Sequence, residues 1–121
     1  MSVPSPSVRR ILLVEDDQMV REIIALFLED AYDVLQATTI AAARRHLQAP
    51  DSPPIELILA DCLLPDGSVM ELLGIADQKN IPVVLISGDP MQAEAMDPSR
   101  PFLPKPFTQE LLLSILVTAR R

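Results

Sequence analysis

Three short runs of uninterrupted apolar residues constrain the fold of this chain more than any other feature. They lie at 11–14, 57–60 and 82–86, and each run ends at a polar residue. A strand with one face in water alternates polar and apolar residues, so these runs predict strands that are covered on both faces. Between 18 and 28 the apolar residues follow a helical spacing instead. Strands that need cover on both faces and alternate with helices indicate a parallel sheet between two helical layers.

Capping residues and prolines divide the rest of the chain into the same alternating pattern. The expected N-terminal caps are Asp17, Thr38 or Thr39, Ser68 with Glu71 as a capping box, Asp89 before Pro90, and Thr108. The expected strands are 11–14, 33–37, 55–60, 82–86 and 101–104. The sequence therefore predicts an α/β fold in which five strands alternate with five helices, and the fourth helix, at 91–96, is short.

Length, charge and cysteine content exclude several classes of protein. The chain has 121 residues, enough for one domain, and a net charge of -7, which disfavours direct binding to nucleic acid. A single cysteine excludes an internal disulfide, and the longest apolar runs are too short for a signal peptide or a membrane span. We therefore expect a soluble, cytoplasmic protein. Residues 1–8 are expected to form a flexible Ser- and Pro-rich tail, and 9–121 the domain.

Polar residues follow four of the expected strands. They are Glu15 and Asp16, Asp61, Ser87 and Lys105. The carboxyl ends of parallel strands meet at one edge of a sheet, so these side chains should converge there. Three carboxylates packed together repel one another, and a hard cation such as Mg²⁺ relieves that repulsion. The lysine and the hydroxyl are suited to phosphoryl oxygens, and a carboxylate can itself accept a phosphoryl group.

The residues around these strand ends resemble the receiver domain of response regulators in bacterial two-component and phosphorelay systems, of the chemotaxis-receiver type. The matching segments are 11–17 (ILLVEDD), 57–67 (LILADCLLPDG), 83–88 (VVLISG) and 102–107 (FLPKPF). The resemblance covers about 9–119, which makes 9–121 the expected receiver domain. It implies a flavodoxin-like, doubly wound, five-stranded parallel sheet with strand order 2-1-3-4-5.

The resemblance also implies a phosphoacceptor and a metal site. Asp61 matches the aspartate that takes a phosphoryl group from a phosphohistidine. Glu15 and Asp16 match the acidic pair that holds Mg²⁺, or Mn²⁺ in its place, together with Asp61 and the backbone carbonyl of Leu63. The phosphoryl donor is then a histidine kinase or a histidine phosphotransfer domain, and the receiver controls a downstream protein effector. Such a domain is a signalling switch with self-phosphotransfer and autodephosphorylation rather than an enzyme.

Three further residues match the family's phosphoryl-binding and switch positions. Ser87 and Lys105 match the hydroxyl and the lysine that bind phosphoryl oxygens. Phe102 matches the aromatic residue that turns inward with the hydroxyl when the domain switches. The resemblance also implies a cis peptide between Lys105 and Pro106.

Two departures and one surface pattern are particular to this chain. Val69 stands where the family commonly has glycine. Four of the 12 prolines lie between Ser87 and Lys105, so the fourth helix and the usual output surface are expected to differ from those of relatives. On the last helix, Leu113 and Val117 form an apolar stripe apart from the expected core residues Leu111, Leu112, Ile115, Leu116 and Ala119. The stripe suggests a surface for a partner or for a second copy of the chain.

Other interpretations stay open from the sequence alone. The domain could act as a scaffold without phosphorylation. It could also be a small Mg²⁺-dependent aspartyl-phosphate phosphatase, although Asp61-Cys62-Leu63 lacks the second acid of the Asp-x-Asp type. The motifs for nucleotide binding, GxGxxG and GxxxxGK[ST], do not occur. The same domain type occurs in hybrid histidine kinases, so the chain could be cut from a larger protein.

Four further residues have no expected role in the site. His46 is expected to be solvated, Cys62 to be buried and inert, and Asp66 and Asp89 to be caps or turn residues.

Overall fold

A five-stranded parallel sheet forms the centre of the computed structural model, which describes residues 9–49 and 54–119. Its strands in spatial order are β2 (Asp33–Ala37), β1 (Arg10–Val14), β3 (Ile55–Asp61), β6 (Val83–Ser87) and β7 (Phe102–Pro104). Because β4 and β5 form a separate hairpin, β6 and β7 are the fourth and fifth strands of this sheet, and the expected order 2-1-3-4-5 is confirmed. The expected tail at 1–8 lies outside the described residues.

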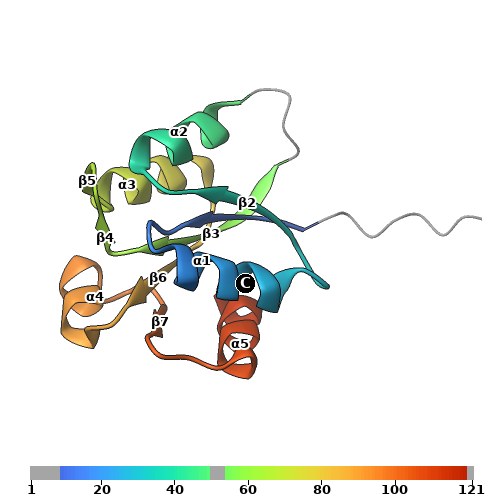
Figure 1. The fold of residues 1–121 in the computed structure, drawn as a ribbon. Coiled ribbons are helices and arrows are strands. Elements are labelled where there is room, and N and C mark those ends of the chain that lie inside the picture. The colour runs from blue at the N-terminus through green and yellow to red at the C-terminus, as the bar shows by residue number, and fades with distance from the viewer. Residues whose placement is uncertain (1–8, 50–53, 120–121) are drawn as a thin grey trace, which may run out of the picture.

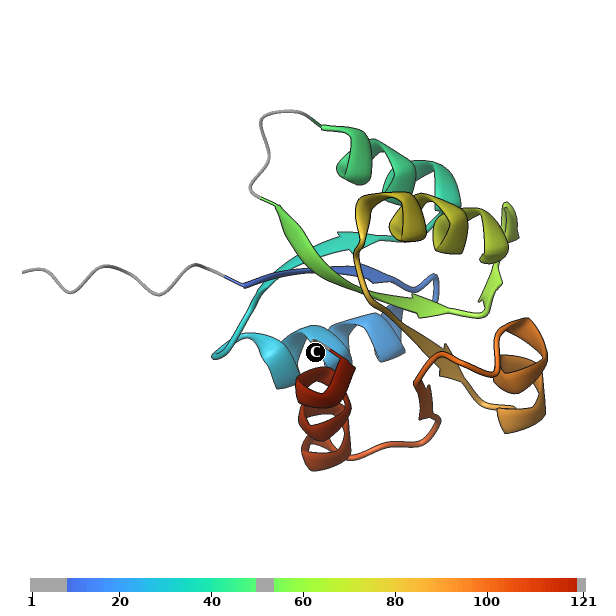
Figure 2. The same cartoon turned by 180° about the vertical axis from the view of Figure 1, so that it is seen from behind.

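Helices cover both faces of the sheet. They are α1 (Gln18–Leu28), α2 (Ile40–Gln48), α3 (Met70–Lys79), α4 (Pro90–Met96) and α5 (Gln109–Ala119). In Figure 1, α2 and α3 lie above the sheet and α1 and α5 below it, and Figure 2 shows the same two layers from behind. Ala93 of α4 packs into the cluster on the α2 and α3 side. Within the described part of the chain, no helix is both long enough and apolar enough to cross a membrane.

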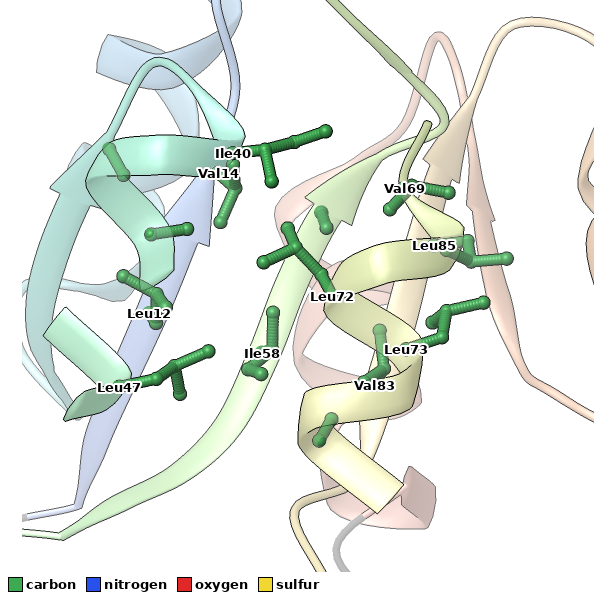
Figure 3. Packing of buried hydrophobic residues seen from close by; sticks show 14 of the residues in the cluster. Leu12, Val14, Ile40, Leu47, Ile58, Val69, Leu72, Leu73, Val83 and Leu85 are labelled. Carbon is green, nitrogen blue, oxygen red and sulfur yellow. The ribbon is translucent and has the colours of Figure 1, made fainter. Parts of the chain in front are cut away.

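The continuous apolar runs are explained by a core on each side of the sheet. Neighbouring residues of a strand point to opposite faces, so Ile58 of β3 packs toward α2 and α3 while Leu57 and Leu59 pack toward α1 and α5. Figure 3 shows the first of these clusters, where strand and helix side chains such as Ile58 and Leu72 point toward one another. Each fully buried leucine or isoleucine contributes about 1.5–3 kcal/mol, so both faces stabilise the sheet.

Most of the helix caps expected from the sequence are present. In four helices, a backbone N–H of the first turn donates to the side-chain oxygen of an expected cap. The accepting atoms are Asp17 Oδ1, Thr39 Oγ1, Asp89 Oδ1 and Thr108 Oγ1. Each such bond satisfies one of the N–H groups that a helix leaves free at its start. These caps fix where the helices begin relative to the strand ends, and therefore where the loops at that edge run.

The capping box expected at Ser68 and Glu71 is wrong. Residues 67–68 form strand β5 (Gly67–Ser68), which pairs with β4 (Leu63–Leu64), so the backbone at Ser68 is extended and α3 begins at Met70. The N-cap is Val69, which makes no side-chain cap bond, and Ser68 Oγ accepts the N–H of Met70 instead. Val69 has φ -61° and ψ -17° and its side chain is fully buried, so this position does not require glycine.

On α5, Leu112 and Leu116 are fully buried and define the side that faces the sheet. Each residue of an α-helix turns by about 100°, so Leu113 lies at the flank of that side and packs partly against the core. Leu111 and Val117 lie farther round and are 37% and 58% exposed. The prediction that Leu111 belongs to the core face is therefore wrong. Of the expected stripe of Leu113 and Val117, only Val117 is exposed.

Candidate functional site

The polar residues predicted to converge do lie at one edge of the sheet. Glu15 and Asp16 follow β1, Asp61 and Ser87 end β3 and β6, and Lys105 follows β7. These four strands are neighbours in the order β1-β3-β6-β7 and all run parallel, so their carboxyl ends lie side by side. In Figure 1 this edge is on the left, where the β4–β5 hairpin and α4 also lie. The edge is therefore the place where the predicted chemistry can occur.

Three carboxylates form a compact acidic cluster there. Glu15, Asp16 and Asp61 each offer one carboxylate oxygen, and these oxygens lie within 4.8 Å of one another. Glu15 is fully buried, Asp61 is 7% exposed, and Asp16 is exposed. Asp61 Oδ1 accepts the backbone N–H of Leu63 at 2.9 Å, which orients the carboxylate. Asp61 is thus recessed, and Asp16 borders it on the solvent side.

Lys105 supplies the positive charge of the site. Its Nζ lies 2.8 Å from Asp61 Oδ2 and 3.2 Å from Glu15 Oε1. Burial lowers the pKa of Lys105, but the hydrogen bond and the charge of Asp61, together with Glu15, outweigh burial and raise the pKa above its ordinary value. The ammonium therefore stays charged at neutral pH. The cis peptide between Lys105 and Pro106, expected from the resemblance, is present.

Glu15 is the most perturbed carboxyl group of the cluster. Burial and the neighbouring Asp61 raise its pKa to about 7, against the lowering effect of the Asp17 N–H and of Lys105. Its Oε1 is buried and, apart from the ion-pair contact with Lys105, has no hydrogen-bond partner among the described residues. A buried carboxylate oxygen that accepts no hydrogen bond and lies inside a group of oxygen ligands belongs to the kind of donor set that a hard divalent cation fits. The residues present are therefore compatible with Mg²⁺.

Ser87 lies at the same edge, and its hydroxyl is engaged locally. Its Oγ donates to the carbonyl of Asp89 at 2.7 Å and accepts the N–H of Asp89 at 2.9 Å. Phe102 lies on β7, is half-buried and packs against the core cluster on the α2 and α3 side. The structure therefore brings Glu15, Asp16, Asp61 and Lys105 together. It places Ser87 at the same edge and Phe102 on β7, against the core cluster.

Comparison with known proteins identifies the family. The family model for the response regulator receiver domain matches residues 11–117. The chain belongs to this family. The receiver domain is 40% identical over 79 residues to the transcriptional regulatory protein VxrB of Vibrio cholerae, covering 64% of this chain and 30% of that protein. It is 30% identical over 116 residues to the CAI-1 autoinducer sensor kinase/phosphatase CqsS of the same organism, covering 88% of this chain and 16% of that protein.

Solved structures give the same fold. The receiver domain of the hybrid histidine kinase CckA is 29% identical, with a TM-score of 0.75, and the match covers 93% of this chain and 99% of that one. A receiver domain protein from Methanospirillum hungatei has a TM-score of 0.78 at 23% identity, covering 93% of both chains. The chain spans from 16% to 52% of the length of its curated relatives. It is thus a receiver domain of two-component signal transduction, and the recessed carboxylate of Asp61 fits a phosphoacceptor role.

Two residues that hold the loops of this receiver domain in place were not assigned these contacts from the sequence. Arg21 of α1 donates from Nη1 to the backbone carbonyl of Glu15 at 3.1 Å. Asp66 accepts the N–H groups of Ile40 and Ala41 at 2.8 and 3.0 Å, so it joins the β4–β5 hairpin to the start of α2. Asp66 was expected to be a cap or turn residue, and it lies in the turn of the β4–β5 hairpin. Its contact with α2 has no local sequence signal, because Ile40 lies 26 residues earlier in the chain. For Arg21, the sequence signal is its position one helical turn after the acidic residues 15–17.

Cys62 has the environment expected for an inert thiol. Its side chain is 1% exposed, and burial, with the charge of Asp61, raises the pKa of the thiol. A thiol that is buried and neutral is a poor nucleophile. The expected buried and inert state of Cys62 therefore fits its surroundings.

Proposed function

We propose that Asp61 accepts a phosphoryl group from the phosphohistidine of a histidine kinase or a histidine phosphotransfer domain, and that the resulting aspartyl-phosphate changes the conformation that a downstream protein effector recognises. The observation that carries this proposal is the set of contacts around Asp61. One carboxylate oxygen is held by the Leu63 N–H and the other by Lys105 Nζ, at 2.9 and 2.8 Å, beside two further carboxylates. A carboxylate fixed in this way is positioned for attack.

In the transfer, a carboxylate oxygen of Asp61 attacks phosphorus, the P–N bond to the donor histidine breaks, and its electron pair remains on the imidazole nitrogen. The Lys105 ammonium then neutralises negative charge on the phosphoryl oxygens. Glu15, Asp16, Asp61 and the backbone carbonyl of Leu63 would hold Mg²⁺ or Mn²⁺. When bound, this ion supplies positive charge for the phosphoryl oxygens. Water later attacks the phosphorus, the P–O bond to Asp61 breaks, and inorganic phosphate leaves while the Asp61 carboxylate is restored.

Ser87 and Phe102 are the proposed switch. The Ser87 hydroxyl is bonded to the backbone of Asp89, and it would exchange these bonds for a phosphoryl oxygen when Asp61 is modified. Phe102 is half-buried against the core and sits on the strand that leads to Lys105, so it can respond to that exchange. The neighbouring α4 has 7 residues, which supports an output surface different from that of a longer helix. The phosphoryl group would bias two conformations rather than create a new one.

An apolar stripe on α1 is the proposed contact surface for the phosphoryl donor. Met19, Ile23 and Leu26 are 71%, 42% and 60% exposed and follow the spacing of one helix face. The stripe begins in the first turn of α1, directly after the acidic loop. A protein that brings a histidine to Asp61 must cover this neighbourhood, and an apolar stripe favours such contact.

A second proposed contact lies on α5. Val117 is exposed, and Leu113 next to it is partly buried. These residues are the proposed surface for homodimer formation or for a partner. Measurement of the mass in solution tests this assignment, because Val117→Glu should convert a dimer to a monomer. A wild-type protein that is already monomeric, together with a Val117→Glu variant that still binds the partner, would contradict it.

A phosphorylation-independent scaffold is the remaining alternative, and the phosphatase interpretation is disfavoured because Leu63 stands where a second acid is needed. We also propose that residues 9–121 form the receiver unit, that 1–8 are a tail, and that the protein works in the cytoplasm. The likeness to CqsS and CckA is compatible with an origin in a sensor or hybrid kinase.

Acetyl phosphate with Mg²⁺ tests the proposed chemistry without a known kinase. Intact mass should show one added phosphoryl group on the wild-type protein, stable in acid and lost in base. Asp61→Asn should abolish the adduct, while Asp89→Asn, a matched change at the same edge, should leave it. A wild-type protein without adduct, or an adduct that persists in Asp61→Asn, would contradict the proposed function.

A further inference from the structure

The loop between β1 and α1 carries three consecutive acidic residues, and Arg21 holds its backbone. Arg21 lies in the second turn of α1 and is half-buried. Its Nη1 donates to the backbone carbonyl of Glu15 at 3.1 Å. The guanidinium therefore reaches back along the helix to the peptide that joins Glu15 to Asp16.

The other hydrogen bonds of this loop hold Glu15 and Asp17, so the position of Asp16 depends on its backbone. The Glu15 N–H donates to the carbonyl of Ala37 at 3.0 Å, and the Asp17 N–H donates to Glu15 Oε2 at 3.1 Å. The Asp17 side chain caps α1 through the N–H of Val20. Glu15 and Asp17 are thus fixed through both backbone and side chain, whereas the Asp16 carboxylate is exposed at the edge of the acidic cluster.

A peptide bond is planar, so holding the Glu15 carbonyl also fixes the direction of the Asp16 N–H and the start of the Asp16 backbone. A rotation of this peptide would move the Asp16 carboxylate away from Glu15 and Asp61. Groups that orient a metal ligand in this way typically change metal affinity by about 10- to 100-fold when they are removed. Arg21 has the position and the donor for this role.

We propose that Arg21 is a positioning residue for the divalent cation site: by holding the Glu15 carbonyl it keeps Asp16 in the geometry that binds Mg²⁺. This inference rests on the proposed function of the acidic cluster. The role opposes the charge of the side chain, because a guanidinium near the site repels a cation. Simple electrostatics therefore expects removal of Arg21 to tighten Mg²⁺ binding, and positioning expects removal to weaken it. The two explanations differ in sign.

The test measures Mg²⁺ affinity of the full chain by calorimetric titration at fixed pH and ionic strength, with Mn²⁺ in electron paramagnetic resonance as a second readout. Arg21→Met keeps an apolar stem but removes the charge and the donor. Arg21→Lys keeps the charge and a single donor. Arg45→Met removes the same charge from an exposed position on α2 and is the matched control.

We expect Arg21→Met to weaken Mg²⁺ binding about tenfold, Arg21→Lys to fall between it and wild type, and Arg45→Met to bind as wild type does. Unchanged or tighter binding by Arg21→Met overturns the inference. Thermal unfolding in chelator checks that the variants fold; if Arg21→Met does not, Arg21→Lys decides, and wild-type affinity in that variant overturns the inference.

The acetyl phosphate assay separates this inference from the proposed function. A wild-type protein that binds Mg²⁺ but forms no adduct contradicts the proposed function and leaves the role of Arg21 testable. A wild-type protein that forms the adduct, with an Arg21→Met variant that binds Mg²⁺ equally well, contradicts the role of Arg21 alone.

Discussion

Replacing Glu15 with glutamine should stabilise the metal-free protein at high pH. Glu15 is fully buried, and its pKa is raised to about 7, from an ordinary value of 4.5, chiefly by burial and by Asp61. In the unfolded chain the carboxyl group loses its proton near pH 4.5, while in the folded protein it keeps the proton until about pH 7. The unfolded state binds fewer protons in this range, so stability is present below pH 4.5 and falls as pH rises to about 7.

The expected magnitude follows from the same two values. The difference between 4.5 and about 7, at about 1.36 kcal/mol for each pH unit, corresponds to roughly 3 kcal/mol. Glutamine has nearly the shape of the protonated acid and keeps an oxygen for the N–H of Asp17, so it avoids this cost. Glu15→Gln should therefore match wild type at pH 4.5 and exceed it by roughly 3 kcal/mol at pH 8 in chelator.

Urea unfolding followed by circular dichroism, with both proteins at each pH, gives the difference directly. Comparison at the same pH cancels the titration of other groups. Mg²⁺ should reduce the advantage of Glu15→Gln at pH 8, since the ion stabilises the wild-type cluster. A variant less stable than wild type at pH 8 in chelator, or a difference that does not depend on pH, would refute this reasoning.

Three further outcomes test the core, the hairpin and the charge of the site. Leu72→Ala should lower the free energy of unfolding by about 2–5 kcal/mol, whereas Met91→Ala, at a side chain that is 79% exposed, should change it by less than about 0.5 kcal/mol in urea unfolding. The N–H groups at the start of α2 lower the pKa of Asp66, so its stabilisation is present above its ordinary pKa of 3.8 and lost as pH falls below that value. Asp66→Asn should accordingly lower the melting temperature at pH 7 and converge with wild type in acid; equal loss at both pH values contradicts this. Lys105→Met should slow adduct formation from acetyl phosphate by about a hundredfold, and an unchanged rate would remove Lys105 from the chemistry.

The fold was predictable because its signals are local in the sequence. Apolar runs that need cover on both faces, such as 57–60, specify strands, and side chains such as Asp17 specify where helices begin. The meeting of Asp61 with Lys105 was also predictable, because parallel strands bring their carboxyl ends to one edge. The resemblance then supplied the proposed roles and the cis peptide at Lys105.

Contacts that do not follow from the strand ends could not be predicted from the sequence. Ser68 has the local signature of a cap, but pairing with Leu63 makes its backbone extended, and tertiary structure overrides the local preference. Asp66 contacts a helix far along the chain, and Arg21 contacts a backbone carbonyl, which has no sequence signature. The direction in which α5 faces depends on packing, and this decided which of its leucines are buried.

The most direct test of the central claim is the location of the phosphoryl group and its dependence on Mg²⁺. After incubation with acetyl phosphate, peptide mass mapping should place the group on the peptide that contains Asp61, with Mg²⁺ present and not with chelator. A phosphoryl group on another residue, or equal modification of Asp61 in chelator, would contradict the claim that this acidic cluster is a metal-dependent phosphoacceptor site.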